Sequence, residues 1–219
     1  MTEVTPNKAD QAFLDIERMI VLQDLPPGTL VSEKQLMERT GLGRTPVREA
    51  LQRLARERLV EIHPNRGVLV PVASIEAQLK LLELRRTLEP FAVRLAALRA
   101  TADQRSAARK LADDVLGTPL TVNEFATFLR SAHALVVGAT HNEYIEVAMA
   151  PLQGLSRRFW FGNLVDPGDD LTRAAQLHHA ILASIAAGDA DAAEAASLAL
   201  SDYLIDFAYG TLPQRSPGP

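Results

Sequence analysis

The chain contains no cysteine, which excludes disulfides, thiolate metal sites and cysteine nucleophiles and fits a reducing compartment. No stretch approaches the roughly 18 consecutive apolar residues that a membrane helix needs. The first residues combine neither a basic segment nor an apolar one, so we expect no secretory signal and a cytoplasmic location. What is present is ordinary globular composition, 47% hydrophobic and 23% charged over 219 residues. This length suits one large domain or two small ones.

Charge is unevenly distributed along the chain. The net charge is −4, which by itself argues against a nucleic-acid partner. Residues 34–66, however, carry eight Lys or Arg and only four acidic residues. A compact basic segment on an acidic chain is the expected footprint of a small module that meets phosphate, although a solvated helix face would look the same.

The pattern of elements predicts two domains of a mainly α protein. Apolar spacing predicts helices over 8–23, 32–39 and 44–57, and two β-rich runs flank an Asn/Gly turn at 64–67. This order is the outline of a winged helix-turn-helix over residues 8–72. From residue 74 to 209 an all-α antiparallel bundle is expected, rich in Ala and Leu. Its helices are predicted near 74–100, 103–116, 121–139, 142–161, 169–187 and 189–209.

The third predicted helix has the features of a DNA-recognition helix. Arg44 and Arg48 lie one turn apart, opposite the apolar stripe, and arginine can fork onto guanine O6 and N7. Thr45 and the first backbone N–H groups of the helix can hold phosphate. A lysine on the preceding helix would lie over the backbone, and the hairpin tip would reach a minor groove. The predicted DNA contacts are Lys34, Gly43, Arg44, Thr45, Arg48, Arg66 and Gly67.

The segment PPGTLVSEKQLMERTGLGRTPVREALQRLARERLV resembles the DNA-binding domain of the GntR family of bacterial transcription regulators. The family pattern combines PG-x-x-L-x-E-x-x-L with SRTPVREAL-x-x-L. Two departures stand out. Gly43 replaces the usual serine before the first arginine, which removes a hydroxyl. Arg58 replaces the usual glycine after the helix, so this residue either takes a positive φ or shifts the turn.

The remainder resembles the FCD (FadR C-terminal domain) subfamily, through LLELRRTLEPFAVRLAA, GATHNEYI and HHAILASIAAGDADAA. The resemblance implies a helical bundle around a ligand cavity, dimerised through its helices. Many members hold a divalent metal with one Asp and three His. Here His133 and His178 match two of these ligands, whereas Leu129 and Leu200 occupy the other two positions. Leucine cannot ligate, and protein metal sites ordinarily supply at least three ligands, so we expect no metal and no other cofactor.

Without a metal, the cavity would suit an organic acid, with Arg85 or Arg130 as the counter-charge. The predicted effector contacts are Arg85, Glu89, Arg130, His133, Asn142, His178 and Tyr203. The alternative for the two histidines is a place in the core. The pair Arg157–Arg158 is expected to be solvated, and Phe159, Trp160 and Phe161 are expected in core or dimer packing.

The sequence therefore predicts a homodimeric, effector-responsive transcription regulator that binds a palindromic DNA operator, with repression as the expected sign and no membrane partner. Two alternatives remain. One is a metal-dependent sensor or enzyme using His133 and His178, although the chain shows no nucleophile paired with a base and no phosphate loop. The other is an architectural DNA binder without an effector.

Overall fold

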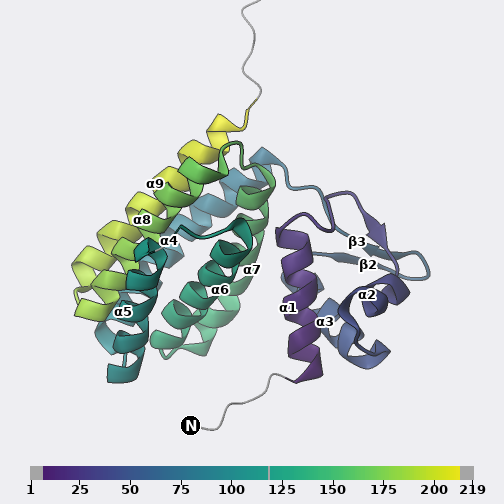
Figure 1. Cartoon of the computed structure of the whole chain (residues 1–219), viewed down its shortest axis with the longest axis horizontal. Helices are drawn as coiled ribbons and strands as arrows, with labels where there is room; N and C mark the ends of the chain where they lie inside the picture. Colours follow the sequence, from purple (N-terminus) through teal and green to yellow (C-terminus); the bar gives the residue numbers. More distant parts are fainter. Residues whose placement is uncertain (1–6, 118, 213–219) are drawn as a thin grey trace, which may run out of the picture.

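The computed structural model describes residues 7–117 and 119–212, which form a small mixed module and a larger helical bundle (Figure 1). The module contains three helices and a small antiparallel sheet in the order β1-β3-β2. Its elements are α1 (Lys8–Val21), β1 (Leu30–Val31), α2 (Glu33–Thr40), α3 (Arg44–Arg56), β2 (Glu61–His63) and β3 (Gly67–Leu69). The expected hairpin is present, and a third strand, β1, pairs with β3 through Val31 and Val68.

The bundle follows the Ala- and Leu-rich half of the chain. Its helices end within two residues of the predicted bounds because the breaks carry capping residues. Asp189 caps one helix with its side chain, and Gly188 ends the preceding one at φ 77°. The helices are α4 (Ile75–Arg99), α5 (Ala102–Gly117), α6 (Val122–Ala139), α7 (Glu143–Gly162), α8 (Pro167–Ala187) and α9 (Ala190–Gly210). Among the described residues, no helix is both long and apolar enough to cross a membrane.

Each part has its own apolar core. The module is held by a cluster that includes residues of α1, α2, α3 and the sheet, with Ile16, Leu36, Leu51 and Leu54 buried. The bundle has a larger cluster, in which Phe159, Trp160 and Phe161 are buried as the sequence predicts.

The module rests on the bundle through α1 and α7 (Figure 1). Leu155 of α7 packs against the core of the module. Two glycines on the same side of α7 allow the close approach. A Cβ on Gly154 would lie 3.3 Å from the Leu59 side chain, and a Cβ on Gly162 would lie 3.0 Å from Nε2 of Gln23. The backbone of α7 therefore lies directly against the module.

Candidate DNA interface and effector cavity

The helix-turn-helix is set by local capping. Ser32 and Gln35 form a reciprocal capping box at the start of α2, and Gly41 ends this helix at φ 68°. Gly43 occupies the N-cap of α3 and makes no side-chain cap bond, so the absence of the usual hydroxyl leaves the first N–H groups of α3 without that partner. Val47 and Leu51 are buried, which fixes the face that α3 turns outward.

The outward face of α3 carries the predicted base-reading residues. Arg44, Thr45 and Arg48 are all exposed. Arg48 donates from Nε to the carboxylate of Glu33 at 2.9 and 3.0 Å, with 60% of its side chain still exposed. Exposed pairs of this kind contribute about 0–1 kcal/mol, so Arg48 can leave Glu33 at small cost. Within the described residues Arg44 makes no ion pair.

The β2–β3 hairpin forms a wing beside α3. Arg66 is exposed at its tip, and Gly67 adopts φ 119°, where a Cβ would lie 2.8 Å from the carbonyl oxygen of Val31. Arg48, Arg66 and Gly67 line one surface groove of about 680 Å³ between the wing and the helices. Lys34 projects from α2 with 86% of its side chain exposed. The structure therefore gathers most of the predicted DNA contacts on one face.

Arg58 adopts φ 59°, which is the first of the two outcomes expected from the missing glycine. Its N–H donates to the carbonyl of Ala55, and the N–H of Leu59 donates to that of Leu54. The helix end is thus closed as glycine would close it, with a residue that finds this conformation less favourable.

The helical domain encloses a cavity between α4, α6, α7, α8 and α9. Its free volume is about 20 Å³, room for about one water molecule. Its wall consists of Arg85, Phe125, Leu129, His133, Ser156, Arg157, Trp160, Ala174, His178, Leu200, Tyr203 and Leu204. Four of the predicted effector contacts, Arg85, His133, His178 and Tyr203, are among them.

His133 presents a hydrogen-bond donor that lacks a partner. Nη1 of Arg157 lies 2.9 Å from Nδ1 of His133, and because a guanidinium only donates, Nδ1 accepts. Burial, and then the charge of Arg157, hold the pKa of His133 well below its usual value, so the ring is neutral and its proton is on Nε2. Nε2 is buried and has no partner within the described part of the chain. A ligand atom placed against it would have to accept a hydrogen bond.

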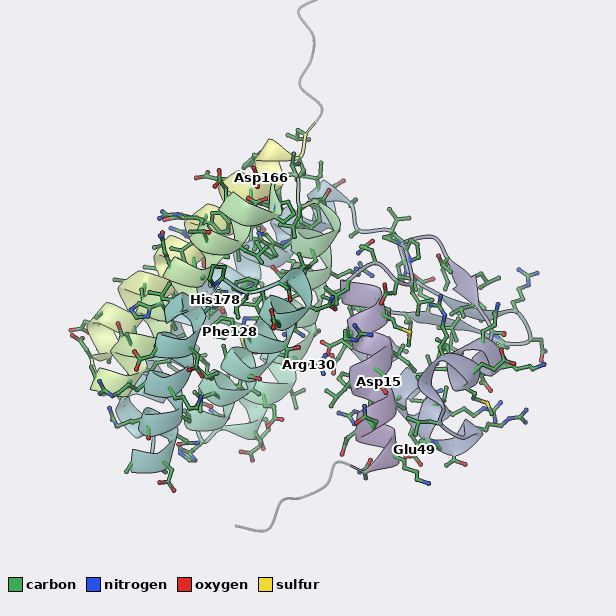
Figure 2. All side chains as sticks on the ribbon, in the orientation of Figure 1. Asp15, Glu49, Phe128, Arg130, Asp166 and His178 are labelled. Carbon is green, nitrogen blue, oxygen red and sulfur yellow. The ribbon has the colours of Figure 1, made fainter. Side chains whose placement is uncertain are left out.

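His178 completes an aromatic corner of the cavity. The centroid of its ring lies 5.7 Å from that of His133. The rings of His178 and Phe128 are T-shaped to one another, with centroids 6.1 Å apart. Figure 2 labels His178 and Phe128 close together. Burial lowers the pKa of His178 to about 3, with further lowering by Arg85 and Arg157. Both histidines are therefore neutral near pH 7. His179 points to α5, where Nδ1 donates to the carbonyl of Ala112.

Arg85 is neutralised within its own helix. Its Nε and Nη2 donate to the two carboxylate oxygens of Glu89 at 2.6 and 2.9 Å, and Nη1 donates to Oγ of Ser156 at 2.8 Å. The side chains of Arg85 and Glu89 are 3% and 5% exposed. Glu89 neutralises the charge of Arg85 but does not itself line the cavity.

Besides that of Glu89, which does not line the cavity, three sequence-based placements need correction. Arg130 lies outside the cavity wall: it projects from α6 toward α1 and pairs with Glu17 at 3.2 Å (Figure 2). Asn142 also lies outside the wall, where its side chain caps α7 by accepting from the N–H of Tyr144. The expectation that Arg157 and Arg158 are solvated is wrong, because both are buried and Arg157 lines the cavity.

Sequence reasoning missed Arg157 because arginine on a helix is solvated by default. Two signals point to it. Arg157 stands three residues before Trp160, on the same helix face. On α1, Glu17 follows Phe13 and precedes Ile20 along the apolar stripe, a position where a carboxylate requires a buried cation.

The residues do not fit the divalent metal that the subfamily resemblance raises. Leu129 and Leu200 stand in the cavity wall beside the two histidines. Arg157 also donates to Nδ1 of His133, which occupies one ring nitrogen and leaves the proton on the other, so neither nitrogen is free to ligate a metal ion. Among the described residues there is no cluster of three or more His, Cys, Asp or Glu suited to a metal ion.

Comparison with known proteins agrees with both halves of this description. The family model described as "Bacterial regulatory proteins, gntR family" matches residues 8–70, and the FCD domain matches residues 80–202. The Nta operon transcriptional regulator of Aminobacter aminovorans is 31% identical over 150 residues, 68% of this chain and 70% of that protein. The galactonate operon transcriptional repressor of Escherichia coli K12 is 25% identical, covering 90% of this chain and 95% of its own.

Solved structures share the fold. Escherichia coli McbR/YncC superposes with a TM-score of 0.77 at 19% identity, covering 95% of this chain and all of the other. A putative GntR regulator from Rhodococcus sp. RHA1 gives a TM-score of 0.65 at 23% identity, covering 96% of this chain and all of the other. The chain belongs to the GntR family of bacterial regulatory proteins and carries the FCD domain behind its winged helix-turn-helix.

Proposed function

We propose that the chain is a homodimeric transcription regulator that reads a palindromic operator with α3 and responds to a small organic acid. The observation that carries this proposal is the exposure of Arg44 and Arg48 on one face of α3, beside the wing. A recognition helix that enters the major groove needs cations that are free to reach base edges. Because the partner is operator DNA, we place the protein in the cytoplasm.

The first experiment measures binding to DNA upstream of the protein's own gene. We expect Arg44→Ala and Arg48→Ala each to lose about 1–3 kcal/mol of specific binding, since each removes one base contact. Lys34→Ala should weaken all sequences alike and reduce the salt slope by about 1. Arg56→Ala, at the far end of α3, is the control of equal charge. Arg44→Ala and Arg48→Ala binding as tightly as Arg56→Ala would refute this reading.

We assign dimerisation to α4 and α7. Leu84, Phe91 and Leu98 recur every seven residues along α4 and are each more than half exposed. The neighbouring α7 adds Tyr144 and Val147, which are also exposed, and the two helices pack together through a shared apolar cluster. Apolar side chains at this spacing form the seam of helix–helix pairing, and a second copy would cover them symmetrically.

Sedimentation measurements test this assignment. Phe91→Glu should yield a monomer, because a charge in the centre of an apolar interface lacks a partner. Val165→Glu is the matched control: it adds the same charge at a side chain that is 93% exposed between α7 and α8, and should leave the dimer intact. A dimer of Phe91→Glu that is as stable as the wild type would contradict the assignment.

The proposed effector is an acid because the cavity offers two donors, Nε2 of His133 and the guanidinium of Arg157. One relative is named for the galactonate operon, and galactonate carries a carboxylate. Ligand pockets usually measure about 300–1,000 Å³, so the walls must move to admit an acid into the small space described. We propose that binding of the effector releases the protein from DNA, so that the protein without effector represses transcription.

A thermal-shift screen of sugar acids and other small carboxylates tests the effector. An acid that binds the cavity should stabilise the wild type and lose most of this effect in His133→Phe, which keeps an aromatic ring but removes the donor. Equal stabilisation of both proteins by every acid that binds would place the site elsewhere.

A further inference from the structure

Arg157 lies between two spaces. On one side is the cavity, and on the other is a cleft of about 300 Å³ between α1, α3, α6 and α7. Both spaces are lined by Arg157 and His133. The guanidinium spans this wall: Nη1 donates to His133 and Nη2 pairs with the carboxylate of Glu17. One cation therefore serves the cavity of the helical domain and a carboxylate of the DNA-binding module.

Glu17 is the buried anchor of the module. It lies on α1, is 3% exposed, and pairs with two arginines of the helical domain, Arg157 and Arg130. Helix α1 in turn packs along α3, where Arg53 pairs with Asp10 at 2.6 Å. The attachment of the recognition helix to the helical domain thus includes a charge pair whose cation faces the cavity.

The other cavity arginine differs in this respect. The carboxylate that neutralises Arg85 comes from Glu89, one turn away on the same helix. Displacing it would disturb only α4 and its neighbours. The carboxylate that neutralises Arg157 lies 140 residues away, in the other domain. Only a ligand that engages Arg157 therefore competes with a contact between the domains.

We propose that the carboxylate of an anionic effector competes with Glu17 for Arg157, so that filling the cavity loosens the DNA-binding module from the helical domain. This inference rests on the proposed function, since it requires an acid in the cavity. The cavity admits about one water molecule while Arg157 reaches across to Glu17, so an acid must shift this side chain or its neighbours. Such a ligand favours the loosened arrangement by its differential affinity for the two arrangements.

The first test needs no effector. Because the chain has no cysteine, Lys8→Cys on α1 and Ser106→Cys on α5 allow two spin labels to be placed selectively. Labelled chains are diluted with unlabelled ones, so that pulsed electron-spin measurements report the distance within one chain. Glu17→Gln should broaden or shift this distance distribution, because a neutral amide holds Arg157 less strongly. Glu146→Gln, which lines the same cleft without an ion pair among the described residues, should leave it unchanged.

The second test measures the competition. The carboxylic acid that most stabilises the wild type, from a panel that includes galactonate, is titrated into each protein by calorimetry. In Glu17→Gln the acid no longer has to displace a carboxylate, so we expect its affinity to rise about tenfold, within the usual range of coupling between sites. Glu146→Gln should bind as the wild type does.

The outcomes separate the two proposals. An acid that binds the wild type and Glu17→Gln with equal affinity overturns the competition while leaving an effector site in place. An unchanged distance distribution in Glu17→Gln overturns the role of this pair in attaching the module. Failure of every acid to bind any of the proteins overturns the effector proposal and, with it, this inference.

Discussion

The buried pair of Arg85 and Glu89 predicts a large loss of stability on a change of a single atom. In Glu89→Gln the carboxylate becomes a neutral amide, and the guanidinium of Arg85 stays buried without its counter-charge. Breaking one partner of a buried pair costs about 3–5 kcal/mol. For a domain of this size each kcal/mol shifts Tm by about 2–4 °C, so we expect a fall of about 6–20 °C.

The same helix provides the matched control. Glu76 and Lys80 have the same spacing of four residues and a distance of 2.7 Å, but both side chains are largely exposed. Thermal unfolding followed by circular dichroism should show no measurable change in Tm for Glu76→Gln. The paired change of Arg85→Met with Glu89→Leu removes both charges and should cost less than Glu89→Gln alone. Equal Tm values for Glu89→Gln and Glu76→Gln would refute the reasoning, since burial is the difference between the two pairs.

Three further predictions concern stability. His178 has a folded pKa of about 3 against 6.5 when unfolded, so the stability it contributes is complete above pH 6.5 and falls as the pH drops. Chemical denaturation should show about 2 kcal/mol less stability at pH 5 than at pH 7 from this group, and His178→Gln should reduce this dependence on pH. A dependence on pH that is unchanged in His178→Gln would contradict this. Burial, reinforced by the charge of Glu17, raises the pKa of Glu57 to about 6. Glu57→Gln should therefore stabilise the protein at pH 7 by about 1 kcal/mol, after allowance for solvent screening, and this gain should disappear below pH 4.5. A gain that does not depend on pH would contradict this. Gly67→Ala should cost about 1–3 kcal/mol of stability, because of the positive φ of this residue and its contact with Val31. Gly138→Ala is the control, since it lies in an open helical position and should be neutral or stabilising. Equal effects of the two substitutions would argue against strain at the wing.

Much of the fold follows from local sequence. Three of the helices in the bundle begin where Asn or Asp interrupts the Ala- and Leu-rich pattern, and Asn142, Asp166 and Asp189 cap them. Strand β1 escaped prediction because Leu30–Val31 is too short to show an alternating pattern, and its partner β3 lies almost forty residues further along. Pairing of strands over that distance depends on how the whole module packs, and not on the residues next to β1 in sequence.

The candidate site divides in the same way. The cations of α3 lie opposite a simple apolar stripe, so their exposure could be predicted from spacing alone. The polar wall of the cavity depends on contacts between distant segments, as in the pairing of Arg157 with Glu17. Spacing correctly places Arg130 near His133 on α6, since both line the cleft that faces α1. Only His133 also lines the cavity, and the pairing of Arg130 with Glu17 of α1 could not be predicted from spacing on α6.

The two glycines of α7 have a consequence for chimeric regulators. The face of α7 that bears Gly154 and Gly162 lies against Leu59 and Gln23, while Ser156 and Trp160 on other faces of the same turns line the cavity. A biosensor made by grafting this helical domain onto a foreign winged helix therefore keeps a contact surface on α7 that is shaped for the side chains of its own winged-helix module. The new module must place side chains against Gly154 and Gly162 as Leu59 and Gln23 do. Without that contact, we expect the grafted protein to bind its ligand without transmitting the effect to the DNA-binding module.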